Sequence, residues 1–183
     1  MSYLKKNLNL PNALTFLRIL MIPAVYITYY KYPDMRWISL VIYLAASFTD
    51  FLDGYLARKW NQITSFGKLF DPLADKLIVL TVLYCLADTG YVPWLVFWLM
   101  IGKEAFLVIG ALGMLGKKVV VKSNIFGKAA TCLFIAAIAL VYPWHNVPAI
   151  FTVGNVMIYI ALAASLLAMG IYAWEAVKIP SKS

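Results

Sequence analysis

Four aspartates lie between residues 50 and 75, and they are half of the eight acidic residues in the chain. Asp50 and Asp53 are three residues apart, and Asp71 and Asp75 are four residues apart. On helices, each spacing places both side chains on one face. If the two helix ends meet, four carboxylates converge, and their mutual repulsion requires compensation. Because oxygen ligands suit hard cations, the pattern predicts one or two divalent ions, with Mg²⁺ or Mn²⁺ first and Ca²⁺ second.

The residues around these aspartates suit a phosphate-bearing ligand. Gly54 and Ala57 are small, and Arg58 can hold a phosphate through two parallel hydrogen bonds. Residues 61–65 supply amides and hydroxyls, and Gly67 lets a backbone approach closely. A metal here would bridge phosphate oxygens, and one carboxylate could deprotonate an attacking alcohol. The combination indicates a site for a diphosphate carried on a lipid.

The composition indicates an integral membrane protein. Of 183 residues, 63% are hydrophobic and 13% are charged, which is about half the charged fraction of a soluble domain. Several apolar stretches approach the roughly 20 residues that a helix needs to cross a bilayer. The net charge of +8 could suit nucleic acid, but the hydropathy favours anionic lipid or a phosphate-bearing substrate instead. We therefore expect one all-α membrane domain, residues 1–183, with no nucleic-acid partner.

The apolar segments predict six transmembrane helices after a short N-terminal surface segment, residues 1–11. The first helix would be capped by Asn12 or Thr15, and it carries Arg18 one turn inside, where a lipid-facing charge is costly. The expected helices run from about 12 to 30, 37 to 57, 68 to 87, 92 to 115, 125 to 141 and 150 to 174.

Basic residues indicate the orientation, because cytoplasmic segments of membrane proteins are rich in lysine and arginine. With both termini inside, outer turns hold only Lys31 and Arg36. The inside segments hold Lys5, Lys6, Arg58, Lys59, Lys117, Lys118, Lys122, Lys178 and Lys182. We therefore expect a multi-pass protein of the inner membrane whose aspartates face the cytoplasm. Aromatic residues near the opposite face are expected to form an interface belt: Tyr29, Tyr30, Tyr32, Trp37, Tyr91, Trp94, Tyr142 and Trp144.

The small residues inside the apolar segments are expected to serve packing and not chemistry. Gly102, Gly110, Gly113 and Gly116 most simply permit close helix packing. Cys85 and Cys132 are interpreted as small buried hydrophobic residues, neither a disulfide nor a metal pair.

The aspartate segment matches the CDP-alcohol phosphotransferase signature, D-x2-D-G-x2-A-R-x8-G-x3-D-x3-D, at every position. The matching residues are Asp50, Asp53, Gly54, Ala57, Arg58, Gly67, Asp71 and Asp75. Residues 10–18 and 64–76 are also similar to the corresponding segments of bacterial phosphatidylglycerophosphate synthases. The chain thus resembles this family over its whole length, since the family core is six transmembrane helices preceded by a short surface helix.

The resemblance implies a homodimer that transfers a phosphatidyl group from CDP-diacylglycerol to an alcohol and releases CMP. Two Mg²⁺ or Mn²⁺ ions would be held by Asp50, Asp53, Asp71 and Asp75. Asp71 and Asp75 would be catalytic, with Asp75 as the general base. The residues expected to contact CDP are Gly54, Ala57, Arg58, Thr64, Ser65 and Gly67.

The resemblance implies glycerol 3-phosphate as the first-choice acceptor, although two motifs depart from the usual pattern. An Arg-Glu or Arg-Asp pair is usual in the fourth helix, where this chain has Lys103-Glu104. The fifth helix begins with residues 127–131, Gly-Lys-Ala-Ala-Thr, which resemble some cardiolipin synthases of the family. Phosphatidylglycerol is therefore the alternative acceptor. Lys103, Lys122 and Lys128 are the candidate acceptor-binding residues.

Other classes of protein fit the pattern less well. A cation transporter could use the aspartates as an ion site, but transport favours acidic residues near the bilayer midplane with access to both faces. An intramembrane prenyltransferase also binds Mg²⁺ and diphosphate, but it needs more helices than 183 residues allow. A purely structural ion-pair network with Arg58, Lys68 and Lys76 would not require the complete signature spacing.

Overall fold

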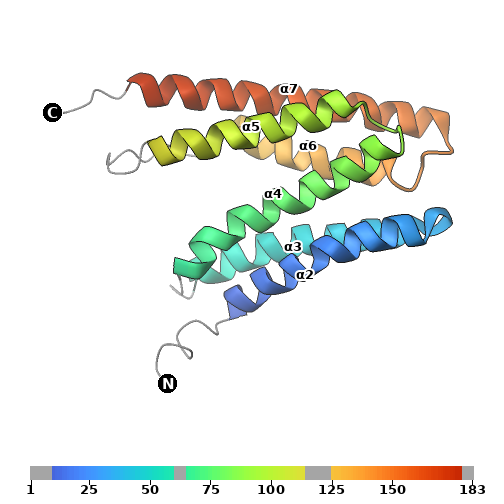
Figure 1. Cartoon of the computed structure of the whole chain (residues 1–183), viewed down its shortest axis with the longest axis horizontal. Helices are drawn as coiled ribbons and strands as arrows, with labels where there is room; N and C mark the ends of the chain where they lie inside the picture. Colours follow the sequence, from blue (N-terminus) through green and yellow to red (C-terminus); the bar gives the residue numbers. More distant parts are fainter. Residues whose placement is uncertain (1–9, 60–64, 114–124, 179–183) are drawn as a thin grey trace. The chain divides into compact units, whose positions relative to one another are not determined.

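The computed structural model describes residues 10–59, 65–113 and 125–178 of the chain. These residues form six α-helices and one 3₁₀ turn, with no β-strand among them (Figure 1). The elements are α2 (Leu10–Lys31), η1 (Pro33–Met35), α3 (Trp37–Lys59), α4 (Ser65–Asp88), α5 (Trp94–Gly113), α6 (Ile125–Val141) and α7 (Pro148–Lys178). The expectation of an all-α protein is confirmed for this part of the chain.

The helices lie close to the positions that the apolar segments predict. The expected helix at 125–141 agrees with α6 at both ends, and the others differ by a few residues at their ends. The capping prediction was wrong, because Asn12 and Thr15 both lie inside α2 and Thr15 is fully buried. Most of the expected surface segment precedes Leu10, outside the described residues.

The chain divides into two compact units, one up to Leu86 and one from Ala87 onward, and each is described by itself. In the first unit, α2 packs along α3. The Ser39 hydroxyl of α3 donates a buried hydrogen bond of 2.8 Å to the main-chain oxygen of Val25 in α2. The Arg36 guanidinium lies 4.7 Å from the ring centroid of Tyr29. These contacts join α2 and α3 at the ends of the two helices that adjoin η1.

Two turns separate the helices where turn-forming residues predict them. Pro33 opens η1, and its ring and missing N–H prevent α2 from continuing as a regular helix. Gly90 follows α4 with a φ of +75°, a left-handed conformation that glycine adopts without strain.

In the second unit, α6 packs closely against α7, and α5 also contacts α7. Gly154 of α7 permits this approach, because a Cβ there would meet Val141 of α6 at 2.6 Å. The packing interpretation finds no support at Gly102 and Gly110, since a Cβ at either residue would have no neighbour within 4 Å among the described residues. The side-chain surroundings of Gly113, and Gly116 itself, lie outside the described part. Small residues therefore bring helices together in this unit, but at a glycine that the sequence pattern did not single out.

The expected aromatic belt needs correction at two residues. Tyr29 and Tyr142 are buried in the helix packing, at 1% and 0% exposure. Five of the expected belt residues do have exposed side chains: Tyr30, Tyr32, Trp37, Trp94 and Trp144. Cys85 is buried as expected, whereas Cys132 is exposed on α6. Each of these differences depends on which face of a helix is turned toward its neighbours.

Two described helices are long and apolar enough to cross a membrane by length and composition. They contain the stretches Ala13–Lys31, of 19 residues, and Pro148–Glu175, of 28 residues. The stretches Trp37–Asp50 and Ile125–Val141 are apolar but shorter. Six membrane spans therefore remain a prediction.

Candidate functional site

The four predicted metal ligands lie near the adjoining ends of α3 and α4. Asp50 and Asp53 belong to the C-terminal half of α3, and Asp71 and Asp75 to the first part of α4. Only residues 60–64 separate the two helices in sequence, so the motif spans two consecutive helices of the first unit. The side chains of Asp53 and Asp71 are outside the described part. Among the side chains that the structure does describe, no three potential metal ligands gather at one point.

Asp50 forms an ion pair with Arg18 of α2. The distance from Arg18 Nη1 to Asp50 Oδ1 is 2.8 Å. The Arg18 side chain is completely buried, whereas that of Asp50 is 38% exposed. Sequence reasoning identified Arg18 as a costly charge inside an apolar helix but assigned it no partner. The pair connects the first helix of the unit directly to the predicted metal site.

Asp75 lies at the edge of the packed interior of the first unit. Its neighbours in α4, Ala74 and Ile78, are buried, while the Asp75 side chain is partly exposed. Its carboxylate is close enough to the buried hydroxyl of Tyr43, in α3, to interact with it electrostatically. Tyr43 and Asp50 are seven residues apart on α3, and such a spacing brings residues to the same helix face. Asp75 of α4 therefore lies near the same face of α3 that carries Asp50.

The predicted CDP-binding residues follow the same two helices. Gly54, Ala57 and Arg58 lie in α3, and Ser65 and Gly67 lie in the first turn of α4. Their side-chain environments are outside the described part, and Thr64 is outside it altogether. Their backbone positions lie on the same two consecutive helices as the aspartates, and their contacts with CDP remain a prediction.

The predicted acceptor residues belong to the second unit or lie outside the described residues. Lys103 Nζ and Glu104 Oε1 of α5 are 2.6 Å apart, and their side chains are only 11% and 15% exposed. Neighbouring residues on a helix need not pair, so the sequence did not predict this ion pair, which the structure shows. Lys128 is exposed in the first turn of α6, and Lys122 is outside the described residues.

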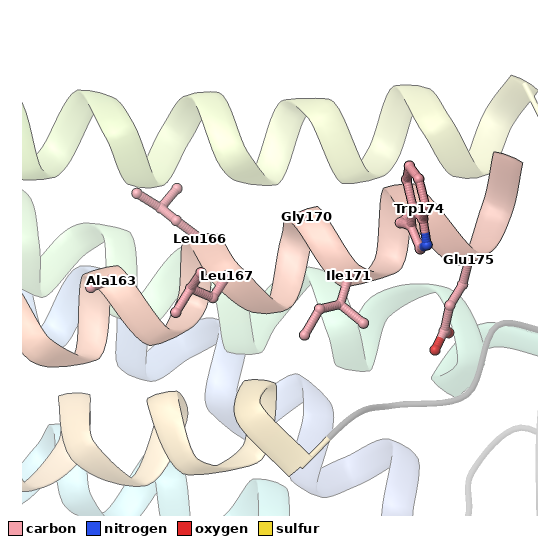
Figure 2. A pocket seen from close by; sticks show the side chains of 7 residues that line it. All are labelled: Ala163, Leu166, Leu167, Gly170, Ile171, Trp174 and Glu175. Atoms are coloured by element: carbon pink, nitrogen blue, oxygen red, sulfur yellow. The ribbon is translucent and has the colours of Figure 1, made fainter.

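A shallow hollow of about 830 Å³ runs along α7. Seven residues of α7 line it, and Figure 2 shows Leu166 and Trp174 on one side of the helix with Ile171 and Glu175 on the other. Its lining is apolar apart from Glu175. Because a diphosphate requires several polar or charged partners, this hollow does not fit the phosphate chemistry that the aspartate motif indicates.

Comparison with known proteins points to the same chemistry as the motif. Residues 8–167 match the family model described as CDP-alcohol phosphatidyltransferase. This range includes the five motif positions of α3, the three motif positions of α4, and most of α7.

Three curated relatives carry the name "CDP-diacylglycerol--glycerol-3-phosphate 3-phosphatidyltransferase". The protein of Rickettsia bellii is 38% identical over 161 residues, covering 84% of this chain and 87% of the relative. That of Aquifex aeolicus is 35% identical over 131 residues, covering 70% and 72%. That of Haemophilus influenzae is 31% identical over 167 residues, covering 88% and 89%.

Proposed function

The chain belongs to the CDP-alcohol phosphatidyltransferase family, and on that premise we propose that it transfers a phosphatidyl group from CDP-diacylglycerol to glycerol 3-phosphate. The products are phosphatidylglycerophosphate and CMP. The observation that carries this proposal is the similarity, over most of the chain, to relatives named for that acceptor. The complete aspartate motif on α3 and α4 supports the same reaction class.

The donor set fits two hard divalent cations. Four carboxylates on two consecutive helix ends offer oxygen ligands, which Mg²⁺ and Mn²⁺ prefer. We assign Asp50, Asp53, Asp71 and Asp75 as the ligands. When bound, the ions would supply positive charge that offsets the negative charge developing as CMP leaves.

The remaining residues bind and orient the substrates in this proposal. Arg58 holds a phosphate of CDP through its guanidinium, and Gly54, Ala57 and Gly67 leave room for the nucleotide. Hydroxyls are supplied by Thr64 and Ser65.

Asp75 takes the proton from the acceptor hydroxyl. The acceptor oxygen then forms a bond to the β-phosphorus, the bond from that phosphorus to the CMP oxygen breaks, and CMP leaves with the electron pair. Asp71 would hold a divalent ion whose charge offsets that of the diphosphate. The proton that Asp75 receives accounts for the one lost by the alcohol.

Acceptor binding is assigned to lysines outside the aspartate motif. Lys103, Lys122 and Lys128 supply positive charge for the phosphate of glycerol 3-phosphate. In this assignment the partly buried pair of Lys103 with Glu104 holds the ammonium group at a defined position along α5.

The proposal includes an arrangement in the membrane. The chain crosses the inner membrane six times as a homodimer, with both termini and the aspartate motif on the cytoplasmic side. The distribution of lysine and arginine supports this orientation, and soluble CMP and glycerol 3-phosphate would be exchanged on that side.

CMP release from the purified protein tests the reaction and the acceptor together. Protein in detergent receives CDP-diacylglycerol and Mg²⁺ with one alcohol at a time: glycerol 3-phosphate, phosphatidylglycerol, inositol phosphate or serine. We expect release above the acceptor-free baseline with glycerol 3-phosphate alone, together with phosphatidylglycerophosphate as the lipid product. Release with phosphatidylglycerol alone would instead identify a cardiolipin synthase, and release with none would contradict the proposal.

A further inference from the structure

The Arg18 side chain is fully buried in the first unit. Its charge therefore lies inside an apolar helix. Ionised groups in such positions are expensive and are retained mainly where they are paired and functional. The carboxylate that Arg18 contacts, at 2.8 Å, belongs to Asp50, the first residue of the aspartate motif. A contact that only joined α2 to α3 could have used any polar residue of α3. This one uses a proposed metal ligand.

We propose that Arg18 is a positioning residue for the metal site and that it acts through Asp50. Its guanidinium holds the Asp50 carboxylate in the orientation in which the remaining oxygen lone pairs can ligate a divalent cation. This inference rests on the proposed function, because it takes Asp50 to be a metal ligand.

The difference in burial between the two side chains supports this role. The guanidinium is completely enclosed, whereas the carboxylate is 38% exposed. The carboxylate therefore has a fixed cation on its buried side and an accessible side where an ion and a substrate can arrive. A carboxylate offers about four acceptor sites, so the contact with Arg18 does not exhaust its capacity to bind a metal.

The contact also comes from outside the helix pair that carries the motif. Arg18 belongs to α2, which is joined to α3 by the Ser39–Val25 hydrogen bond and contacts α4 through the rings of Tyr26 and Tyr84, 6.2 Å apart. A guanidinium on this packed helix restrains the Asp50 rotamer before any ion binds. Partners that hold a metal ligand in this way typically change metal affinity by about 10- to 100-fold when they are removed.

A positive charge beside a metal site also has an opposing effect, because it repels the incoming cation. Two substitutions separate orientation from repulsion. Arg18→Met removes both effects, whereas Arg18→Lys keeps the charge but loses the planar guanidinium fork. If orientation dominates, Arg18→Met weakens metal binding and Arg18→Lys restores part of the affinity.

The test is a titration of the purified full chain in detergent with Mn²⁺ alone, in which the free ion is followed by electron paramagnetic resonance. We expect Arg18→Met to raise the dissociation constant at least about 10-fold. Arg36→Met is the matched control. Arg36 precedes α3 by one residue and packs on Tyr29, about 20 Å along the helix from Asp50. This variant should bind Mn²⁺ like the wild type.

Action through Asp50 is tested by a double-mutant cycle. In an Asp50→Asn background, which keeps an acceptor oxygen for Arg18, adding Arg18→Met should change the Mn²⁺ affinity by no more than about 2-fold. An undiminished loss of affinity in that background would show that Arg18 acts by another route and would overturn the proposal.

Unfolding temperatures, measured on the same samples, separate positioning from a structural role. An Arg18→Met protein with a lower unfolding temperature but wild-type Mn²⁺ affinity would contradict the inference, and so would tighter binding. If Arg18→Met does not fold, wild-type affinity in Arg18→Lys would contradict it equally. These outcomes differ from failure of the proposed function, in which the wild type itself would bind no Mn²⁺ or release no CMP.

Discussion

Gly154 of α7 lies directly against Val141 of α6. A Cβ added at Gly154 would stand 2.6 Å from Val141 Cγ2 and 3.2 Å from the Val141 main-chain nitrogen. The first contact is shorter than any that real Cβ atoms adopt, and the second involves backbone that cannot rotate away. The approach of α6 and α7 therefore depends on the missing side chain at this position.

Gly154→Ala should destabilise the protein by about 1–3 kcal/mol, the usual effect of overpacking in a closely packed interior. The measurement is thermal unfolding of the purified protein in detergent. Gly170→Ala, on the same helix, is the matched control, because a Cβ at Gly170 has no neighbour within 4 Å in the part of the chain that the structure describes. Since alanine favours a helix over glycine, this control should be as stable as the wild type or slightly more so. Equal stability of both variants would show that α6 and α7 can separate without loss.

Asp71→Asn should lower CMP release about 100-fold or more, because an amide replaces a charged ligand at the point where transition-state charge is offset. The assay uses CDP-diacylglycerol, glycerol 3-phosphate and Mg²⁺. Asp34→Asn controls for a general loss of acidic charge, since Asp34 is exposed in η1, before the start of α3. Near-normal turnover by a folded Asp71→Asn protein would remove Asp71 from the site.

Asp75→Asn should abolish transfer and leave CDP-diacylglycerol bound. The amide keeps the volume of the side chain but cannot accept the proton of the acceptor hydroxyl. Two measurements on the same variant are needed, CMP release and direct binding of CDP-diacylglycerol. If binding disappeared together with transfer, Asp75 would serve mainly as a metal ligand and the proton would need another acceptor.

Removal of divalent cations should stop CMP release, because the four carboxylates would then repel both one another and the diphosphate. EDTA is added to the purified protein, and activity is then followed during addition of Mg²⁺ or Mn²⁺ in excess over the chelator. Either ion should restore the rate with saturation. EDTA loaded beforehand with Mg²⁺ is the control and should leave the rate unchanged. A rate that survives thorough chelation would exclude the proposed metal site.

The amino-acid sequence by itself determined the helical class, the approximate helix bounds and the position of the motif on two consecutive helices. Local rules are sufficient for these features. Apolar runs of helical length predict helices, Pro33 interrupts the first of them, and Gly90 follows the end of α4. The spacing of the eight motif residues between positions 50 and 75 depends only on the sequence, so it also indicated the family before any contact was known.

Only the tertiary structure decided which side chains meet. Arg18 and Asp50 are 32 residues apart in sequence, and their ion pair requires α2 and α3 to pack at one particular register. The burial of Tyr29 and Tyr142 and the exposure of Cys132 have the same origin, because hydropathy identifies an apolar helix but not the face that a neighbour covers. In a nearly uniformly apolar chain, the pattern that would reveal the buried face is weak, so the packing of whole helices has to supply it.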